Sequence, residues 1–191
     1  LAGNPVHPGD VKLVDLNGDG IINLYDQTAI GNTKPSIFLG TTVGFNFKGF
    51  DVSVLLQALL NHTYQQTDYS FGSNGEGQGF NYLMGRWTPE TAATATYPRL
   101  TLGLDPTNTP YLNNSSYWTR SGEYLRIRNM DIGYTLPFAV TSKIKLAGVR
   151  LFANAYNLFT WTPYDRLDPE ISSGTAYPAQ RIFNFGVNIK L

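Results

Sequence analysis

Residues 15–26 place oxygen-bearing side chains at the spacing of a calcium-binding loop. Side chains fall at positions 1, 3, 5, 9 and 12 of an EF-hand-like pattern, a main-chain carbonyl falls at position 7, and a glycine at position 6 allows the sharp turn. Calcium is a hard cation that prefers several oxygen ligands. The expected ligands are Asp15, Asn17, Asp19, Ile21 through its carbonyl, Asn23 and Asp26. The alternative is a turn that is held by hydrogen bonds from its side chains to its own backbone.

The remaining chemistry-bearing residues form no catalytic set. The chain has no cysteine and only two histidines, so thiolate metal sites are excluded and no Ser, His and Asp arrangement of known spacing is present. Asp168 and Glu170 flank Pro169, but no partner for acid–base work is identifiable. Arg126, Arg128 and Arg150 either line a pore or pair with carboxylates across strands, and we favour pairing.

Aromatic residues are frequent in the segments between the expected strands. Such side chains can stack on sugar rings, but loop aromatics more often pack into small local cores, and we favour packing. They are Tyr69, Phe71, Phe80, Tyr82, Trp87, Tyr111, Tyr117 and Trp118.

The composition favours an all-β protein with one face in an apolar medium. Charged residues make up 15% of the 191 residues, aromatic residues make up 14%, and the formal net charge is zero. A nucleic-acid-binding protein would carry a basic excess. No apolar stretch approaches the length of about 20 residues that a membrane helix needs. The chain begins at Leu1 without a secretory signal, which we interpret as a piece of a longer protein.

Five segments show the alternation of apolar and polar residues that predicts β-strands. They cover about residues 39–47, 50–64, 122–136, 149–161 and 183–191. A tight turn at Lys48 and Gly49 joins the first two. The third changes phase between Ile127 and Met130, which predicts a β-bulge. In the fourth, Phe152, Tyr156 and Leu158 break the alternation.

The length of these strands and of their connections favours a membrane barrel. A spanning strand needs about 9–11 residues, whereas strands of globular sheets have about 5–6. Residues 65–121 hold no long periodic segment, and such a connection is usual on the outer side of a barrel. A soluble β-sandwich with long strands is the alternative. Five strands alone would leave two unpaired edges in lipid, so they must pair with the remainder of a parent barrel.

A series of short motifs resembles the C-terminal region of SusC/RagA-type TonB-dependent outer-membrane transporters of Bacteroidota. Each motif is weak alone, but together they follow the family order over nearly the whole chain. They are Gly9-Asp10-Val11-Lys12, Asp15 to Ile22, Asp26, Ile30-Gly31-Asn32, Gly49-Phe50-Asp51-Val52-Ser53, Trp87-Thr88-Pro89-Glu90, Tyr97-Pro98-Arg99-Leu100, Tyr124 to Asn129, Gly133 to Pro137, Asn157-Leu158-Phe159-Thr160, Asp168-Pro169-Glu170, Tyr177-Pro178 and the terminal strand. The last residue is Leu191, where the family often has Phe.

The resemblance implies a fold and partners. It implies about five C-terminal antiparallel strands of a large transmembrane β-barrel with long extracellular loops, located in the cell outer membrane. Residues 1–36 would be an extracellular loop with the calcium motif, and residues 37–191 barrel strands and loops, with the plug absent. The family imports glycans or peptides with a SusD-type surface lipoprotein and is driven by TonB through the absent N-terminal part. Residues 162–180 and 65–121 would then be extracellular, and residues 48–49 and 137–147 periplasmic.

Two other classes of function remain open. A secreted calcium-dependent carbohydrate-binding β-sandwich would use the same calcium loop, whereas a dockerin would need two such repeats and only one is present. A hydrolase lacks any catalytic set. We therefore expect a protein that is not an enzyme and does not bind nucleic acid, and whose surroundings are outer-membrane lipid.

Overall fold

The computed structural model describes residues 6–65, 81–101, 114–164, 168–171 and 177–191. The chain forms two compact units that are interleaved along the sequence. The loop unit is Leu1–Thr33, Thr63–Arg120 and Ser172–Ala176, and the strand unit is Lys34–His62, Ser121–Ile171 and Tyr177–Leu191. The expected division into an extracellular loop of residues 1–36 and barrel strands and loops of residues 37–191 stays a prediction.

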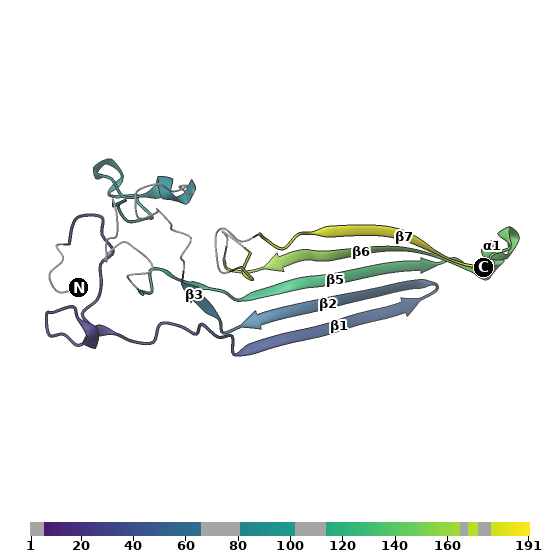
Figure 1. Ribbon diagram of the computed structural model, residues 1–191, viewed down its shortest axis with the longest axis horizontal. Coiled ribbons are helices and arrows are strands. Elements are labelled where there is room, and N and C mark those ends of the chain that lie inside the picture. The colour runs from purple at the N-terminus through teal and green to yellow at the C-terminus, as the bar shows by residue number, and fades with distance from the viewer. Residues whose placement is uncertain (1–5, 66–80, 102–113, 165–167, 172–176) are drawn as a thin grey trace. The chain divides into compact units, whose positions relative to one another are not determined.

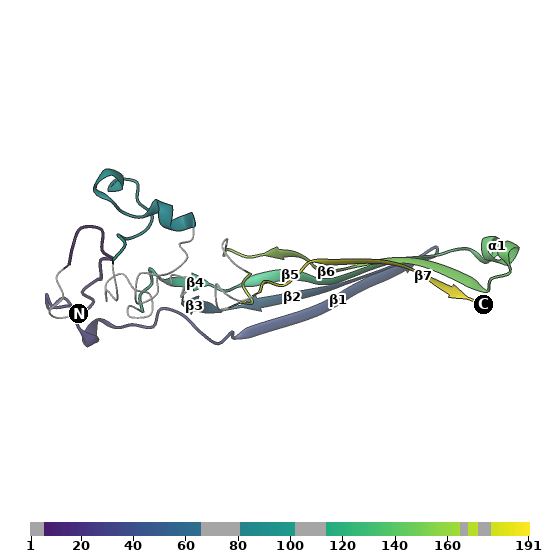
Figure 2. The same ribbon diagram turned by 45° about the horizontal axis from the view of Figure 1, so that its top comes forward.

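The strand unit is a five-stranded antiparallel sheet in which each strand pairs with its neighbours in sequence (Figure 1). Its order is β1-β2-β5-β6-β7, and Figure 2 shows the strands crossing in projection, as expected for a twisted sheet. The strands are β1 (Ile37–Phe47), β2 (Phe50–Leu60), β5 (Tyr124–Thr135), β6 (Gly148–Trp161) and β7 (Ile182–Lys190). All five predicted strands are present.

The second strand is shorter than predicted. The expectation of one strand over residues 50–64 is wrong at its end, because β2 stops at Leu60 and Asn61 adopts a positive φ of 54°. Asn tolerates this left-handed conformation better than most residues, and here it interrupts the extended backbone. The chain resumes as the separate strand β3 (Thr63–Gln65), which pairs with β4 (Thr119–Ser121).

Short connections join the strands at one end of the sheet. The predicted turn between β1 and β2 is confirmed, with positive φ of 47° at Lys48 and 88° at Gly49, the signs of a type I′ hairpin turn. Residues 137–147, which the resemblance places on the periplasmic side, contain the helix α1 (Phe138–Thr141) and the 3₁₀ turn η4 (Ser142–Ile144). Figure 1 shows α1 at the same end of the sheet as the C-terminus.

Residues that pair directly across an antiparallel sheet point to the same side. The register therefore sorts the strands into an apolar face and a polar face. The apolar face consists of 37, 39, 41, 43, 45 and 47 on β1; 50, 52, 54, 56, 58 and 60 on β2; 125, 127, 130, 132 and 134 on β5; 149, 151, 153, 155, 159 and 161 on β6; and 183, 185, 187 and 189 on β7. Thr41 and Tyr134 carry its hydroxyl groups, Trp161 adds an indole N–H, and its other side chains are apolar. The polar face carries Asp51, Arg126, Asp131 and Arg150 among the remaining residues.

The predicted β-bulge in the third strand is confirmed. The register of β5 shifts at Arg128 against both β2 and β6. The shift keeps Ile127 and Met130 on the apolar face although they are three positions apart in the sequence. At the same level β6 passes through Asn157, whose φ is 51°. Both strands thereby bring their apolar side chains to one face.

The loop unit has little regular structure and a small core of its own. Besides β3 and most of β4 it contains the 3₁₀ turns η1 (Leu24–Asp26), η2 (Asn81–Gly85) and η3 (Pro89–Thr91). Leu83, Tyr97 and Trp118 form the core, with Val11 and Tyr117 packed against it. Four stretches that are distant in sequence thus meet around one aromatic cluster.

No helix among the described residues combines the length and apolarity needed to cross a bilayer.

Candidate functional site

An ion pair on the polar face bridges two strands that are not neighbours. Arg150 on β6 donates from Nε to Asp51 Oδ1 on β2 at 2.9 Å, and its Nη2 pairs with Asp51 Oδ2. The side chain crosses β5 at Gly133, where an added Cβ would lie 2.2 Å from Arg150 Nη2. Gly133 therefore provides the space through which the guanidinium reaches its carboxylate. The expected pairing of Arg150 is confirmed.

Arg126 and Arg128 are also paired, but with carboxylates from a loop instead of a strand. Arg126 Nη2 lies 2.5 Å from Asp168 Oδ1, and its Nη1 lies 2.5 Å from Glu170 Oε2. Arg128 Nη1 contacts the same Glu170 oxygen at 2.8 Å. We call Asp168, Pro169 and Glu170 the carboxylate turn. Pairing was foreseen, but these partners were not, because alternation along strands says nothing about a loop that folds back.

Two neutral groups complete the contacts of Glu170. Its Oε1 accepts hydrogen bonds from Tyr124 Oη at 2.8 Å and from Gln57 Nε2 at 3.3 Å. Glu170 is therefore bound by β2 and β5 together. Both carboxylates of the carboxylate turn are engaged with cations, so neither is poised for acid–base chemistry.

Of the three residues that broke the predicted alternation of β6, Phe152 and Tyr156 lie on the polar face, and Leu158 falls in the irregular stretch outside the paired register. Phe152 pairs with Gly133 on one side and with Gly186 on the other. An added Cβ at Gly186 would lie 2.3 Å from the ring of Phe152. A bulky ring is thus accommodated by a glycine beside it. The break in the alternation is explained by packing against glycines on the neighbouring strands, and the sequence of one strand alone does not show such packing.

The predicted calcium loop is closed by hydrogen bonds from its own side chains. Asp15 accepts from the N–H groups of Gly18 at 2.6 Å and Gly20 at 2.7 Å. Asp26 accepts from Leu16 at 2.8 Å and from Asn23 at 2.7 Å. Gly18 and Gly20 have positive φ of 77° and 82°. The alternative of a hydrogen-bonded turn is therefore present in the structure.

The same donors also fit calcium by chemical type. Every expected ligand is an oxygen, and a carboxylate oxygen that accepts one N–H keeps a second lone pair. The hydrogen bond from the N–H of Asn23 is the main cause that holds the pKa of the Asp26 carboxyl below its ordinary value of 3.8, so the charged form is favoured. In the described part of the chain, however, no three Asp, Glu, His or Cys side chains are gathered as a metal cluster. Calcium binding stays a prediction.

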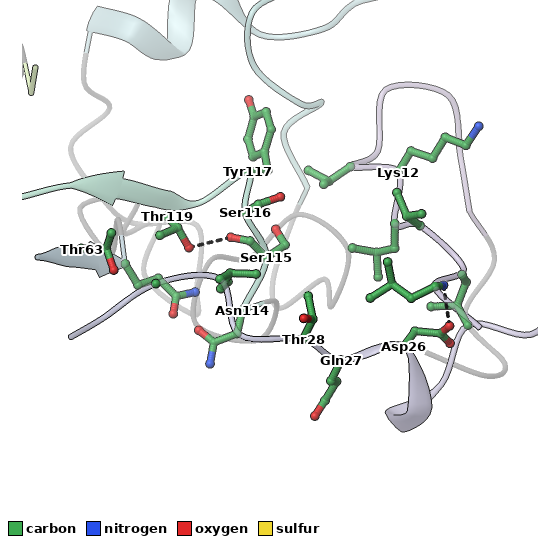
Figure 3. Close-up of a pocket in the computed structure, with 18 of the residues that line it drawn as sticks. Lys12, Asp26, Gln27, Thr28, Thr63, Asn114, Ser115, Ser116, Tyr117 and Thr119 are labelled. Carbon is green, nitrogen blue, oxygen red and sulfur yellow. Dashed lines mark hydrogen bonds between the residues drawn. The ribbon is translucent and has the colours of Figure 1, made fainter. Parts of the chain in front are cut away.

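A hollow of about 1020 Å³ lies within the loop unit beside this loop. Figure 3 shows Asp26 and Lys12 on one side and Ser115, Tyr117 and Thr119 on another, with Thr28 between them. Its wall mixes aliphatic side chains of residues 11–30 with hydroxyl and amide groups of residues 63–65 and 114–119. The predicted calcium loop therefore forms part of the wall of a cavity.

The aromatic residues of the loop unit pack, where the structure describes them. Trp118 is fully buried and makes edge-to-face contact with Tyr117 at 4.8 Å between ring centroids. Trp87 lies so close to Gly9 that an added Cβ would stand 2.5 Å from its ring. Packing is thus confirmed for these three aromatics. The expectations for Tyr69, Phe71, Phe80, Tyr82 and Tyr111 fall on side chains outside the described residues.

Curated proteins similar to this chain are TonB-dependent receptors. TonB-dependent receptor P3 of Formosa agariphila is 28% identical over an alignment of 203 residues, and this alignment covers 96% of this chain and 19% of the relative. TonB-dependent receptor SusC of Bacteroides thetaiotaomicron is 28% identical over 187 residues, covering 96% of this chain and 18% of SusC. The chain spans about a fifth of the length of the curated relatives it matches. No protein-family model matches it.

Solved structures extend the similarity to three dimensions. The structure of the RagAB peptide transporter matches with a TM-score of 0.66 and 23% identity, over 88% of this chain and 19% of the matched chain. The expected fold, C-terminal antiparallel strands of a large transporter barrel, is confirmed, and so is the resemblance to the SusC/RagA type. The β-sandwich alternative is not favoured. The relatives are named as receptors and transporters rather than enzymes.

Proposed function

We propose that this chain is the C-terminal part of a TonB-dependent outer-membrane transporter that imports glycan oligosaccharides or peptides. The observation that carries the proposal is the sheet with one apolar and one polar face, because such a sheet suits lipid on one side and an aqueous interior on the other. The relatives named as TonB-dependent receptors support the same reading over 96% of the chain. The chain has no catalytic part in this function.

The proposed partners follow from the same relatives. A SusD-type surface lipoprotein covers the outer opening, TonB supplies energy through a part of the protein outside this chain, and outer-membrane lipid surrounds the apolar face. The remainder of the parent barrel pairs with β1 and β7. RagAB, which the strands resemble, is described as a peptide importer, so peptides are the first substrate class to test.

Membranes of the native source provide the test. The full-length protein should remain in the detergent extract and migrate in unheated SDS as a compact form that shifts on boiling, as closed barrels do. Deletion of its gene should then abolish uptake of labelled oligopeptides or oligosaccharides but leave glucose uptake unchanged. Release of the protein into the soluble fraction as a compact monomer would contradict the proposal and bring back the secreted calcium-dependent module.

We also propose that the 15–26 loop binds one structural calcium ion. The register of its six oxygen donors supports this, and so does a loop backbone already closed by Asp15 and Asp26. The full-length protein in detergent should bind calcium with a dissociation constant of about 0.1–1 mM, the range of extracellular sites. Asp15→Asn should weaken binding in calorimetry, whereas Glu90→Gln, in the loop unit but outside the motif, should not. No heat of binding at millimolar calcium would rule the site out.

A further inference from the structure

The carboxylate turn lies against the polar face of the sheet instead of extending away from it. Arg126 Nη1 and Nη2 each approach one of its carboxylates at 2.5 Å. The N–H of Glu170 donates to Asp168 Oδ1 at 3.0 Å, which fixes the two carboxylates relative to each other. Arg126 therefore holds both ends of the turn at once.

Burial makes this attachment hard to release. The Arg126 side chain is 1% exposed, against 13% for Asp168 and 26% for Glu170. If the turn left, a buried guanidinium would lose both carboxylates, and an unpaired buried charge is strongly unfavourable. The cluster of Arg126, Arg128, Asp168 and Glu170 is neutral as it stands, with two charges of each sign.

The connection between β6 and β7 is also fastened at both ends, by Glu123 just before β5 and by Asn157 on β6. Thr162 Oγ1 donates to the carbonyl of Glu123 at 2.8 Å, and Asn157 Nδ2 donates to the carbonyl of Gln180 at 2.9 Å. Asn157 Oδ1 in turn accepts from Arg128 Nη1 at 3.2 Å. The β-bulge that holds Arg128 and Asn157 thus serves the attachment of the loop.

We propose that the carboxylate turn is a fixed part of the polar face and that Arg126 is the residue that positions it. This inference rests on the proposed function, because the polar face lines a transport path only in the barrel. A solute that passes there meets a wall in which the charges of Arg126 and Arg128 are already neutralised. The carboxylate turn narrows the path permanently and does not open as a gate.

Cysteine labelling in intact cells tests the attachment without any need for a known substrate. Pro169 is buried, whereas Tyr177 on the same connection is 84% exposed. In the full-length protein, Pro169→Cys should react with a membrane-impermeant maleimide at least about tenfold more slowly than Tyr177→Cys, since tenfold corresponds to only about 1.4 kcal/mol. Adding Arg126→Met should bring the two rates within about twofold of each other, since the turn then loses its buried partner.

Matched variants separate the positioning role from general damage. Arg150→Met removes the other polar-face ion pair and should leave Pro169→Cys protected. Arg126→Lys should restore part of the protection, because an ammonium group can satisfy one of the two carboxylates. If Arg126→Met fails to give the SDS-resistant form, Asp168→Asn with Glu170→Gln removes the same attraction from the loop side and should also expose Pro169→Cys.

Two results would overturn the inference: fast labelling of Pro169→Cys in the otherwise unchanged protein, or protection that survives the loss of Arg126 or of both carboxylates. Failure of the proposed function would look different. The protein would then be found in the soluble fraction as a compact monomer, and the labelling of Pro169→Cys relative to Tyr177→Cys would be read in that fraction with the same expected outcomes.

Discussion

An arginine on the apolar face should lower the free energy of unfolding by very different amounts, depending on how deep in the membrane it lies. Val54 lies four residues along β2 from Phe50, and both side chains are on the apolar face. At a rise of about 3.3 Å per residue and a tilt of about 40°, Val54 lies about 10 Å deeper than Phe50. The apolar band of such barrels is about 25 Å tall, so Phe50 at the interface puts Val54 near the middle of the membrane.

The expected costs follow from these depths. Val54→Arg should destabilise the barrel by about 2–4 kcal/mol and Phe50→Arg by about 0–1 kcal/mol. The difference of about 2–3 kcal/mol corresponds to roughly a 30- to 150-fold change in the ratio of folded to unfolded protein. Ser53→Arg is the control, because Ser53 lies on the polar face and pairs with Asp131, a carboxylate that an arginine can contact.

The assay is guanidinium unfolding of the full-length protein in lipid vesicles, followed by the fraction that keeps the compact form in unheated SDS. Equal costs at Val54 and Phe50 would refute the reasoning, because a face packed inside a soluble sandwich has no gradient of depth. A cost for Ser53→Arg as large as that for Val54→Arg would show that the two faces have been assigned wrongly.

Three further changes test other parts of the structure. Gly133→Ala should cost about 1–3 kcal/mol, since its Cβ displaces Arg150, whereas Gly40→Ala, which meets nothing within 4 Å, should be neutral by the same unfolding assay. The pKa of Asp26 is lowered by folding, so the stability that this carboxylate contributes is present above pH 3.8 and is lost as the pH falls through its folded-state pKa. Protection of the loop amides from hydrogen exchange should therefore fall over the same pH range. In Asp26→Asn this pH dependence should be absent. Trp118→Ala removes a fully buried ring, which costs about 3–5 kcal/mol in a core, and should open the loop unit to protease while the SDS-resistant form persists.

The strands could be predicted from the sequence because alternation is a local property. It gave five strands, the turn at Lys48 and Gly49, and the bulge near Arg128, where the phase of the apolar residues changes. The end of β2 was missed because Leu60 is followed by residues that also fit a strand, and the left-handed Asn61 leaves no mark in the alternation. Phe152 looked irregular because the glycine that makes room for its ring, Gly186, lies on another strand.

The contacts of the loops could not be predicted in the same way. Asp168 and Glu170 were noticed as neighbouring carboxylates, but their partner Arg126 is 42 residues away from the first of them. The core around Trp118 joins segments that have no periodicity, so only the packed structure identifies its members. The spacing of residues 15–26 was enough to identify the oxygen donors of this loop, and the binding of calcium by them stays a prediction.

The shift in register at Arg128 and Asn157 has a consequence for how such sheets diverge. Between matched pairs on either side of this level, β2 has no extra residue, β5 has one, and β6 has two. The side chains that face outward remain apolar on all three strands. Insertions and deletions at this level therefore alter strand length and the inner surface without exposing a polar residue to the surroundings of the barrel.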